Sequence, residues 1–136
     1  MGCSKTLIGN LCRASDVVLF SAAVPHQGGV GHINEQRQSY WADLFEAEGY
    51  DALDVIRPAV WSNTAVRFWH RQNLLLYVRR GSSKIDHNRL REGQKPILDL
   101  IHPEMHEAEA RDAKTSLRRF AWKARDRLRS ALGAIS

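Results

Sequence analysis

The sequence predicts an α/β domain with a three-stranded sheet and a long C-terminal helix. Three observations predict it: a valine-rich run at Val17–Val24, a second apolar run at Leu74–Val78, and an apolar stripe at helical spacing between Ala113 and Leu132. Short apolar runs without alternation are typical of strands that helices cover on both faces. The 136 residues, 43% hydrophobic and 26% charged, are ordinary for one soluble globular domain.

The first strand leads into a glycine-rich loop and then a helix. Proline cannot donate a hydrogen bond to a sheet ladder, so Pro25 is expected to end the strand Val17–Val24. The glycines at 28, 29 and 31 form the loop. The helix expected over Asn34–Glu48 begins at an asparagine, a good N-cap residue, and ends before Gly49, a typical left-handed C-cap.

The second and third strands differ in charge, which predicts their order in the sheet. Tyr50–Arg57 carries several charges and is expected at an edge, with Pro58 ending it. Ser62 is placed to cap a short helix over 63–68. Leu74–Val78 is apolar throughout, so we expect it at the centre, between the first strand and the second.

The chain divides into three parts by composition. Residues 1–80 hold the predicted sheet, and residues 5–14 are expected to end a helix before it. Residues 81–96 form a polar linker, since glycine and serine recur there. Residues 97–136 form a basic amphipathic helix, with Pro103 well placed in its first turn.

Four further side chains have expected places. Trp41 is expected to pack on the sheet, because it shares one helical face with other aromatic residues. Asn73, at the entry to the central strand, is expected to satisfy backbone groups. Arg57 and Trp61 are expected at the rim, where Arg57 could pair with an edge carboxylate.

Several short segments of the sequence resemble the C-terminal half of a family of bacterial class I methyltransferases that use S-adenosylmethionine (SAM), and they occur in the same order. The segments are SAAVPHQGGVGHINEQ, SYWADLF, GYDALDVIRP and WSNTAVRFWHRQNLLLYV, within residues 11–78. One departure is His26, where the family pattern has glycine between proline and glutamine. The glycine-rich SAM loop of the family's N-terminal half, and the acidic residue after its second strand, have no counterpart in these 136 residues.

The resemblance implies a partial Rossmann-like methyltransferase sheet, in which the third strand runs antiparallel between the first and the second. It implies SAM as the cofactor and a small-molecule or glycan-linked acceptor as the substrate. No cofactor-binding residue is assigned in this chain. We therefore expect a truncated, acceptor-side half that is inactive alone, and that pairs with a SAM-binding half or with itself through the open edge of the first strand.

The loop between Pro25 and Glu35 is the candidate site. Glycines let a backbone approach a ligand closely, and polar side chains surround them here. By the resemblance, His32 is the candidate general base and Glu35 its orienting carboxylate. The candidate substrate-binding residues are Gln27, Gly28, Gly29 and Asn34. The alternative is that His32 and Asn34 only cap the helix and hold the loop.

Other site types are less well supported. The glycine loop does not match GxGxxG, so a dinucleotide site is not expected. His102 and His106 are four residues apart, but Pro103 intervenes, and no metal site is predicted. Cys3 and Cys12 are expected to be reduced thiols, which favours a cytoplasmic protein. No apolar run approaches the roughly 20 residues that span a bilayer.

The chain is nearly balanced in charge through Arg80, and the residues after Arg80 carry most of the net charge of +5. Three interpretations of the C-terminal helix remain: a stripe packed on the domain, which is preferred, a contact with nucleic acid, and a helix lying on a membrane surface. The alternative function is accordingly a module that binds nucleic acid or an anionic surface, with nucleic acid the less favoured partner. The basic residues concerned are Arg118, Arg119, Lys123, Arg125, Arg127 and Arg129.

Overall fold

The computed structural model describes residues 2–28, 31–86, 90 and 96–133, and within 126–133 it describes the backbone only. The chain has two compact units, Met1–His102 and Pro103–Ser136, and each is described by itself. Part of the predicted linker, and Gly29 of the candidate site, lie outside the described residues. Residues 97–102 belong to the first unit rather than to the unit of the C-terminal helix.

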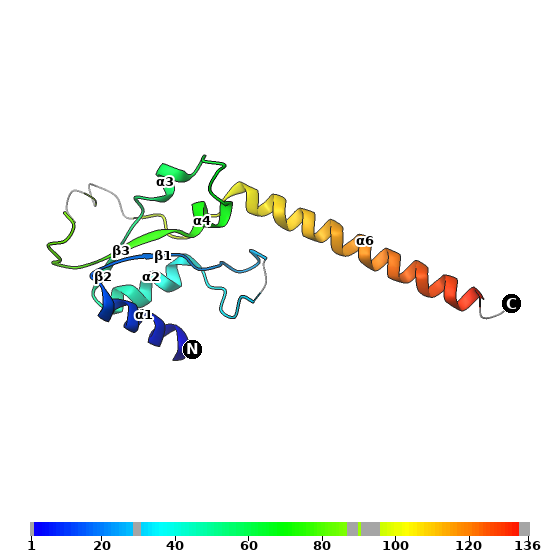
Figure 1. Ribbon diagram of the computed structural model, residues 1–136, viewed down its shortest axis with the longest axis horizontal. Helices are drawn as coiled ribbons and strands as arrows, with labels where there is room; N and C mark the ends of the chain where they lie inside the picture. The colour runs from blue at the N-terminus through cyan, green and yellow to red at the C-terminus, as the bar shows by residue number, and fades with distance from the viewer. Residues whose placement is uncertain (1, 29–30, 87–89, 91–95, 134–136) are drawn as a thin grey trace. The chain divides into compact units, whose positions relative to one another are not determined.

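The first unit is built on a three-stranded antiparallel sheet. Its strands are β1 (Val17–Phe20), β2 (Tyr50–Leu53) and β3 (Leu75–Arg79), in the order β1-β3-β2 (Figure 1). β3 runs antiparallel to both neighbours, and its Tyr77 lies opposite Val18 on one side and Ala52 on the other. The predicted strand order and the antiparallel central strand are confirmed.

Two helices cover one face of this sheet. Figure 1 shows α1 (Gly2–Ala14) and α2 (Gln38–Ala47) on the same side of the strands. Phe45 is fully buried and stacks on Tyr77, with ring centroids 3.8 Å apart. Trp41 is buried beside them, as predicted. The other members of this core are Ile8, Cys12, Val18, Ala42, Tyr50 and Leu75.

The first two strands are shorter than the sequence predicted. A strand to Val24 is wrong, because β3 begins at Leu75, opposite Phe20, and gives the chain no partner beyond that pair. A strand to Arg57 is also wrong. The chain leaves the sheet after Leu53, and α3 (Arg57–Val60) starts at that arginine. Proline suits the first turn of a helix, where its missing N–H would be unpaired anyway.

Two helix predictions also need correction. α2 begins at Gln38 rather than Asn34. Its N-cap residue Arg37 makes no capping hydrogen bond, and the Asp99 carboxylate instead accepts from the Ser39 N–H of the first turn (2.8 Å). Gly49, however, has a φ of 82°, which confirms its place after the helix. The short helix predicted over 63–68 is instead α4 (Phe68–Asn73). The Asn63 side chain accepts a hydrogen bond from the Ala65 N–H (3.0 Å), a local turn that competes with helix formation.

One expectation for β1 fails. Helices were expected on both of its faces, but the Leu19 side chain is 55% exposed. The Arg79 N–H donates to the Asp16 carbonyl (2.8 Å), and with the register of the ladder this directs the backbone groups of Val17 and Leu19 away from β3. The Ser15 hydroxyl accepts from the Val17 N–H (3.2 Å) and donates to the Val17 carbonyl (2.9 Å). The edge at Leu19 is left without a strand partner among the described residues.

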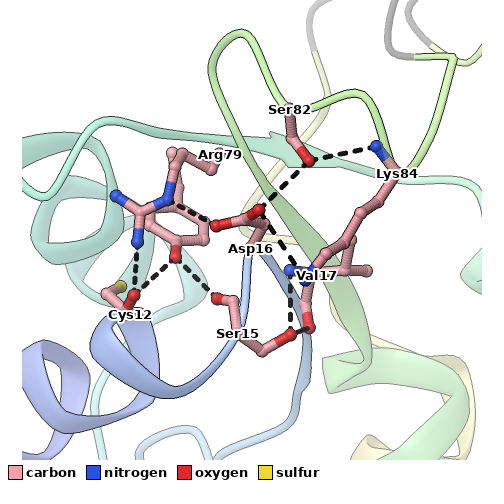
Figure 2. A network of polar contacts seen from close by, with 8 residues as sticks. Cys12, Ser15, Asp16, Val17, Arg79, Ser82 and Lys84 are labelled. Atoms are coloured by element: carbon pink, nitrogen blue, oxygen red, sulfur yellow. Dashed lines mark hydrogen bonds and ion pairs between the residues drawn. The ribbon is translucent and has the colours of Figure 1, made fainter.

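A polar cluster fastens the end of α1 to the sheet (Figure 2). The Arg79 guanidinium donates to the Asp16 carboxylate (2.8 Å) and to the Cys12 carbonyl. The Tyr50 hydroxyl donates to the Cys12 and Ser15 carbonyls, at 2.9 and 2.6 Å. Orphan carbonyls at a helix end are thus satisfied by side chains from two strands. The hydrogen bond from Arg79 holds the pKa of Asp16 below its usual value, and burial raises the pKa of the Cys12 thiol.

Replacing Asp16 by asparagine should lower stability at neutral pH only. The pKa of Asp16 is lower in the folded protein, so its stabilisation is present above the ordinary aspartate value of 3.8 and is lost as the pH falls below it. Thermal unfolding should show Asp16→Asn melting below the wild type at pH 7, with the two converging in acid. Asp43→Asn, an exposed control, should match the wild type throughout. A gap that stays constant with pH would contradict the assignment.

The second unit is the helix α6 (Pro103–Gly133), which begins at the predicted proline. Every side chain from 110 to 125 is exposed. Leu117, Phe120 and Trp122 are 68%, 74% and 58% exposed. The preferred interpretation, a stripe packed on the domain, concerns a contact between the two units and stays a prediction. Among the described residues, no helix is both long and apolar enough to cross a membrane.

Candidate functional site

The candidate site is the loop 21–37, which connects β1 to α2. Its backbone takes left-handed conformations at Gly28 (φ 75°), at Gly31 (φ 80°) and at His26 (φ 67°). Such conformations suit glycine and are uncommon for a residue with a side chain. The glycines therefore shape this loop, as the sequence indicated.

Glu35 joins two parts of the loop. One carboxylate oxygen lies 3.0 Å from Nδ1 of His32, and the other accepts a hydrogen bond from the His26 backbone N–H (3.3 Å). The side chains of His32 and Glu35 are 35% and 30% exposed. A carboxylate that accepts from Nδ1–H leaves Nε2 as the proton acceptor of the ring. This is the geometry that a general base needs. The same two contacts of Glu35 also tie His26 and His32 together within the loop.

Two candidate substrate-binding side chains are engaged within the protein. The Gln27 side-chain oxygen accepts from Asn73 (2.5 Å) and from the Val24 N–H (3.4 Å). The Asn34 amide donates to the hydroxyl of Ser4 in α1 (2.6 Å), and Asn34 is not an N-cap. Both side chains anchor the loop. This supports the alternative in which the polar side chains only hold the loop. The expectation that Asn34 caps the helix is wrong.

Beneath the loop lies a buried polar network that the sequence analysis missed. The Asn73 side-chain oxygen accepts from Gln38 (3.2 Å) and from Gln72 (3.0 Å). The Gln72 oxygen accepts from the His102 N–H (2.7 Å). Asn73 is structural, as predicted, but it bonds side chains rather than backbone. A signal was present, because Gln38 stands on the same helical face as Trp41 and Phe45.

Arg57 is a charged residue of this region, and its exposed fraction is zero. It makes a bidentate pair with Asp54, at 2.8 and 2.7 Å. It also donates to three carbonyls, of Gln72 (3.2 Å), Leu98 (2.9 Å) and Ile97 (2.5 Å). The prediction of a pair with a carboxylate is confirmed, but the predicted rim position is wrong. Arg57 ties residues 97–98 to the body of the unit.

The two histidines near the start of α6 are unlike each other. His102 is buried, and its Nε2 lies 3.1 Å from the carbonyl of Trp61. His106 is exposed and lies beside Glu109, at 3.6 Å. Within the part of the chain that the structure describes, no group of His, Cys, Asp and Glu is arranged to hold a metal ion.

A shallow hollow of about 280 Å³ lies along β2, at the sheet edge opposite β1. Acidic side chains line it, but Arg80 pairs with Asp51 (2.9 Å) and with Glu46 (3.6 Å). Two of the carboxylates that line the hollow therefore already have a cation, and the hollow does not coincide with the candidate loop.

The described loop residues do not by themselves fit SAM. The carboxylate of Glu35 is shared between His26 and His32, and Gln27 is held by Asn73. Among the described residues of the loop, no buried side-chain nitrogen or oxygen lacks a hydrogen-bond partner. The expectation that the chain supplies no cofactor-binding residue stays a prediction.

The conformation of His26 gives a test of the loop's geometry. His26→Gly should raise the free energy of unfolding by up to about 1 kcal/mol. The reason is that the steric cost of a positive φ for histidine exceeds the conformational entropy that glycine adds to the unfolded chain. His26→Val, a β-branched control, should lower it. Urea denaturation of the three proteins measures the order. A glycine variant less stable than the wild type would contradict the assigned backbone.

Comparisons of the chain with protein-family models, with curated proteins and with solved structures find no match.

Proposed function

We propose that residues 1–80 form the acceptor-side half of a class I SAM-dependent methyltransferase, and that the chain alone transfers no methyl group. The strand order is the observation that carries this proposal. The last strand in sequence lies between the first two and runs antiparallel to both. This is the arrangement that the resemblance implies, and it agrees with the charges in Tyr50–Arg57, which favour an edge position for the second strand.

The backbone at His26 supports the same proposal independently. The family pattern has glycine at this position, and the chain takes a left-handed φ of 67° there. A conformation that favours glycine is thus kept where the side chain has changed. At His26 the side chain differs from the family pattern, but the backbone keeps the conformation that the family's glycine favours.

The loop supplies the acceptor chemistry in this proposal. Methyl transfer to an oxygen or nitrogen requires that the acceptor be positioned and that it lose a proton. Nε2 of His32 would accept that proton, and Glu35 would hold the ring through Nδ1 (3.0 Å). The acceptor would be a small molecule or a glycan-linked group, bound over Gly28 and the neighbouring backbone.

The cofactor would be held by a segment outside the described residues. The outer edge of β1 would be the place for it, because among the described residues the backbone groups of Leu19 have no strand partner there. A strand of a SAM-binding half that paired with β1 would extend the sheet and bring its ligand toward the loop after β1. The Ser15 hydroxyl already bonds the backbone N–H and carbonyl of Val17. Pairing would therefore involve the later part of β1, around Leu19.

We expect this edge to cause self-association of the chain by itself. Exposed strand edges pair readily with other strands, and a lysine on the edge opposes such pairing. Sedimentation velocity should show the wild type associating and Leu19→Lys as a monomer. Leu7→Lys, at an exposed leucine of α1, is the matched control and should associate like the wild type. A wild-type chain that stays monomeric at high concentration would count against the open edge.

Calorimetric titration with SAM tests the proposal that this chain binds the acceptor and that another segment binds the cofactor. We expect no saturable heat with the 136-residue chain alone, since in this proposal another segment holds the cofactor. Tight, stoichiometric binding would contradict the proposal that this chain is only the acceptor side.

A further inference from the structure

We propose that α6 binds the surface of an anionic lipid bilayer, with the stripe around Leu117 and Phe120 against the lipid. This goes beyond the proposed methyl transfer and concerns the second unit alone. Its basis is that one helix segment carries exposed apolar side chains and an uninterrupted basic charge.

The charge of the helix changes sign along its length. Glu104, Glu107, Glu109 and Asp112 lie in its first turns. The segment from Ala113 to Arg125 then has five basic residues and no acidic one, and all of its side chains are exposed. Basic residues close to an anionic leaflet attract it, and this charge complementarity identifies the partner.

The apolar stripe favours a flat surface over a second helix. Leu117 and Phe120 are 68% and 74% exposed, so their side chains are available. Leu128 and Leu132 continue the spacing in the sequence. One row of apolar positions recurs about every 3.8 residues, longer than the repeat of about 3.5 that a two-stranded coiled coil needs. The row consists of Ala113, Leu117, Phe120, Ala124, Leu128 and Leu132. Such a helix presents a stripe suited to lying in a bilayer interface.

Trp122 distinguishes a bilayer from nucleic acid. At about 100° per residue it projects some 140° away from Leu117 and 160° away from Phe120, on the side that carries Arg118 and Arg125. A bilayer that receives the stripe would leave Trp122 in water. A single-stranded nucleic acid would instead use an aromatic ring among arginines for base stacking.

The test is co-sedimentation of the full chain with vesicles of phosphatidylcholine, with or without phosphatidylserine. We expect binding only when phosphatidylserine is present, and weaker binding at high salt. Leu117→Gln with Phe120→Gln should weaken it about tenfold or more, and Arg118→Gln with Arg119→Gln about thirtyfold. Trp122→Gln, the matched aromatic control, should bind like the wild type. Circular dichroism should show the same helix content in every variant.

Three outcomes would overturn the proposal. One is no binding to phosphatidylserine vesicles. Another is tight binding to a single-stranded RNA that Trp122→Gln abolishes while the Leu117 and Phe120 changes leave it intact, which would assign the helix to nucleic acid. The last is a wild-type oligomer that the Leu117 and Phe120 changes convert to a monomer, which would assign the stripe to a second copy of the chain.

Discussion

Replacing Arg57 by methionine should lower the free energy of unfolding by about 3 to 5 kcal/mol, because it removes one partner of a buried ion pair. Methionine fills much of the same space but leaves the Asp54 carboxylate and three carbonyl groups without their donor. Small domains are stable by only about 5 to 15 kcal/mol, so a large share of the total would be lost. Urea denaturation followed by circular dichroism measures the change.

Arg80 provides the matched control for Arg57. It also pairs with a carboxylate, that of Asp51 at 2.9 Å, but its side chain is 49% exposed. Surface ion pairs contribute only about 0 to 1 kcal/mol, so Arg80→Met should be nearly neutral. Equal losses for the two methionine variants would show that burial of Arg57 is not what makes it important.

Phe45→Ala should destabilise the protein by a similar amount, about 3 to 5 kcal/mol. The ring is fully buried, stacks on Tyr77 at 3.8 Å, and packs edge-on against Phe20 at 5.6 Å. Its removal leaves a cavity between α2 and the sheet, and the neighbouring rings can fill it only in part. Phe45→Leu, which keeps most of the volume, should cost less than the alanine change.

An exposed phenylalanine gives the control for this second substitution. Phe120→Ala, at a ring that is 74% exposed, should leave the unfolding midpoint of the first unit unchanged. If Phe45→Ala were equally mild, the core would not lie between α2 and β3 as described.

The order of the strands could be predicted because charge and hydropathy differ between them. Leu74–Val78 has no polar residue, whereas Tyr50–Arg57 has three charged ones, and a central strand cannot leave charges unpaired. The ends of the strands could not be predicted in this way. β1 stops at Phe20 because its partner begins at Leu75, and that limit depends on a segment more than fifty residues away in the chain.

The candidate loop could be located from its glycines, but the direction of its side chains could not. Gln27 turns inward to Asn73, and Asn34 reaches Ser4, which lies thirty residues earlier. Tertiary contacts of this kind have no local pattern. Arg57 is a sharper case, because an arginine beside a proline gives no sign that it will be completely buried.

The measurement that tests the central claim most directly is a calorimetric SAM titration of the 136-residue chain beside an intact class I methyltransferase. We predict saturable binding by the intact enzyme and none by this chain. Tight, stoichiometric binding by this chain would contradict the account.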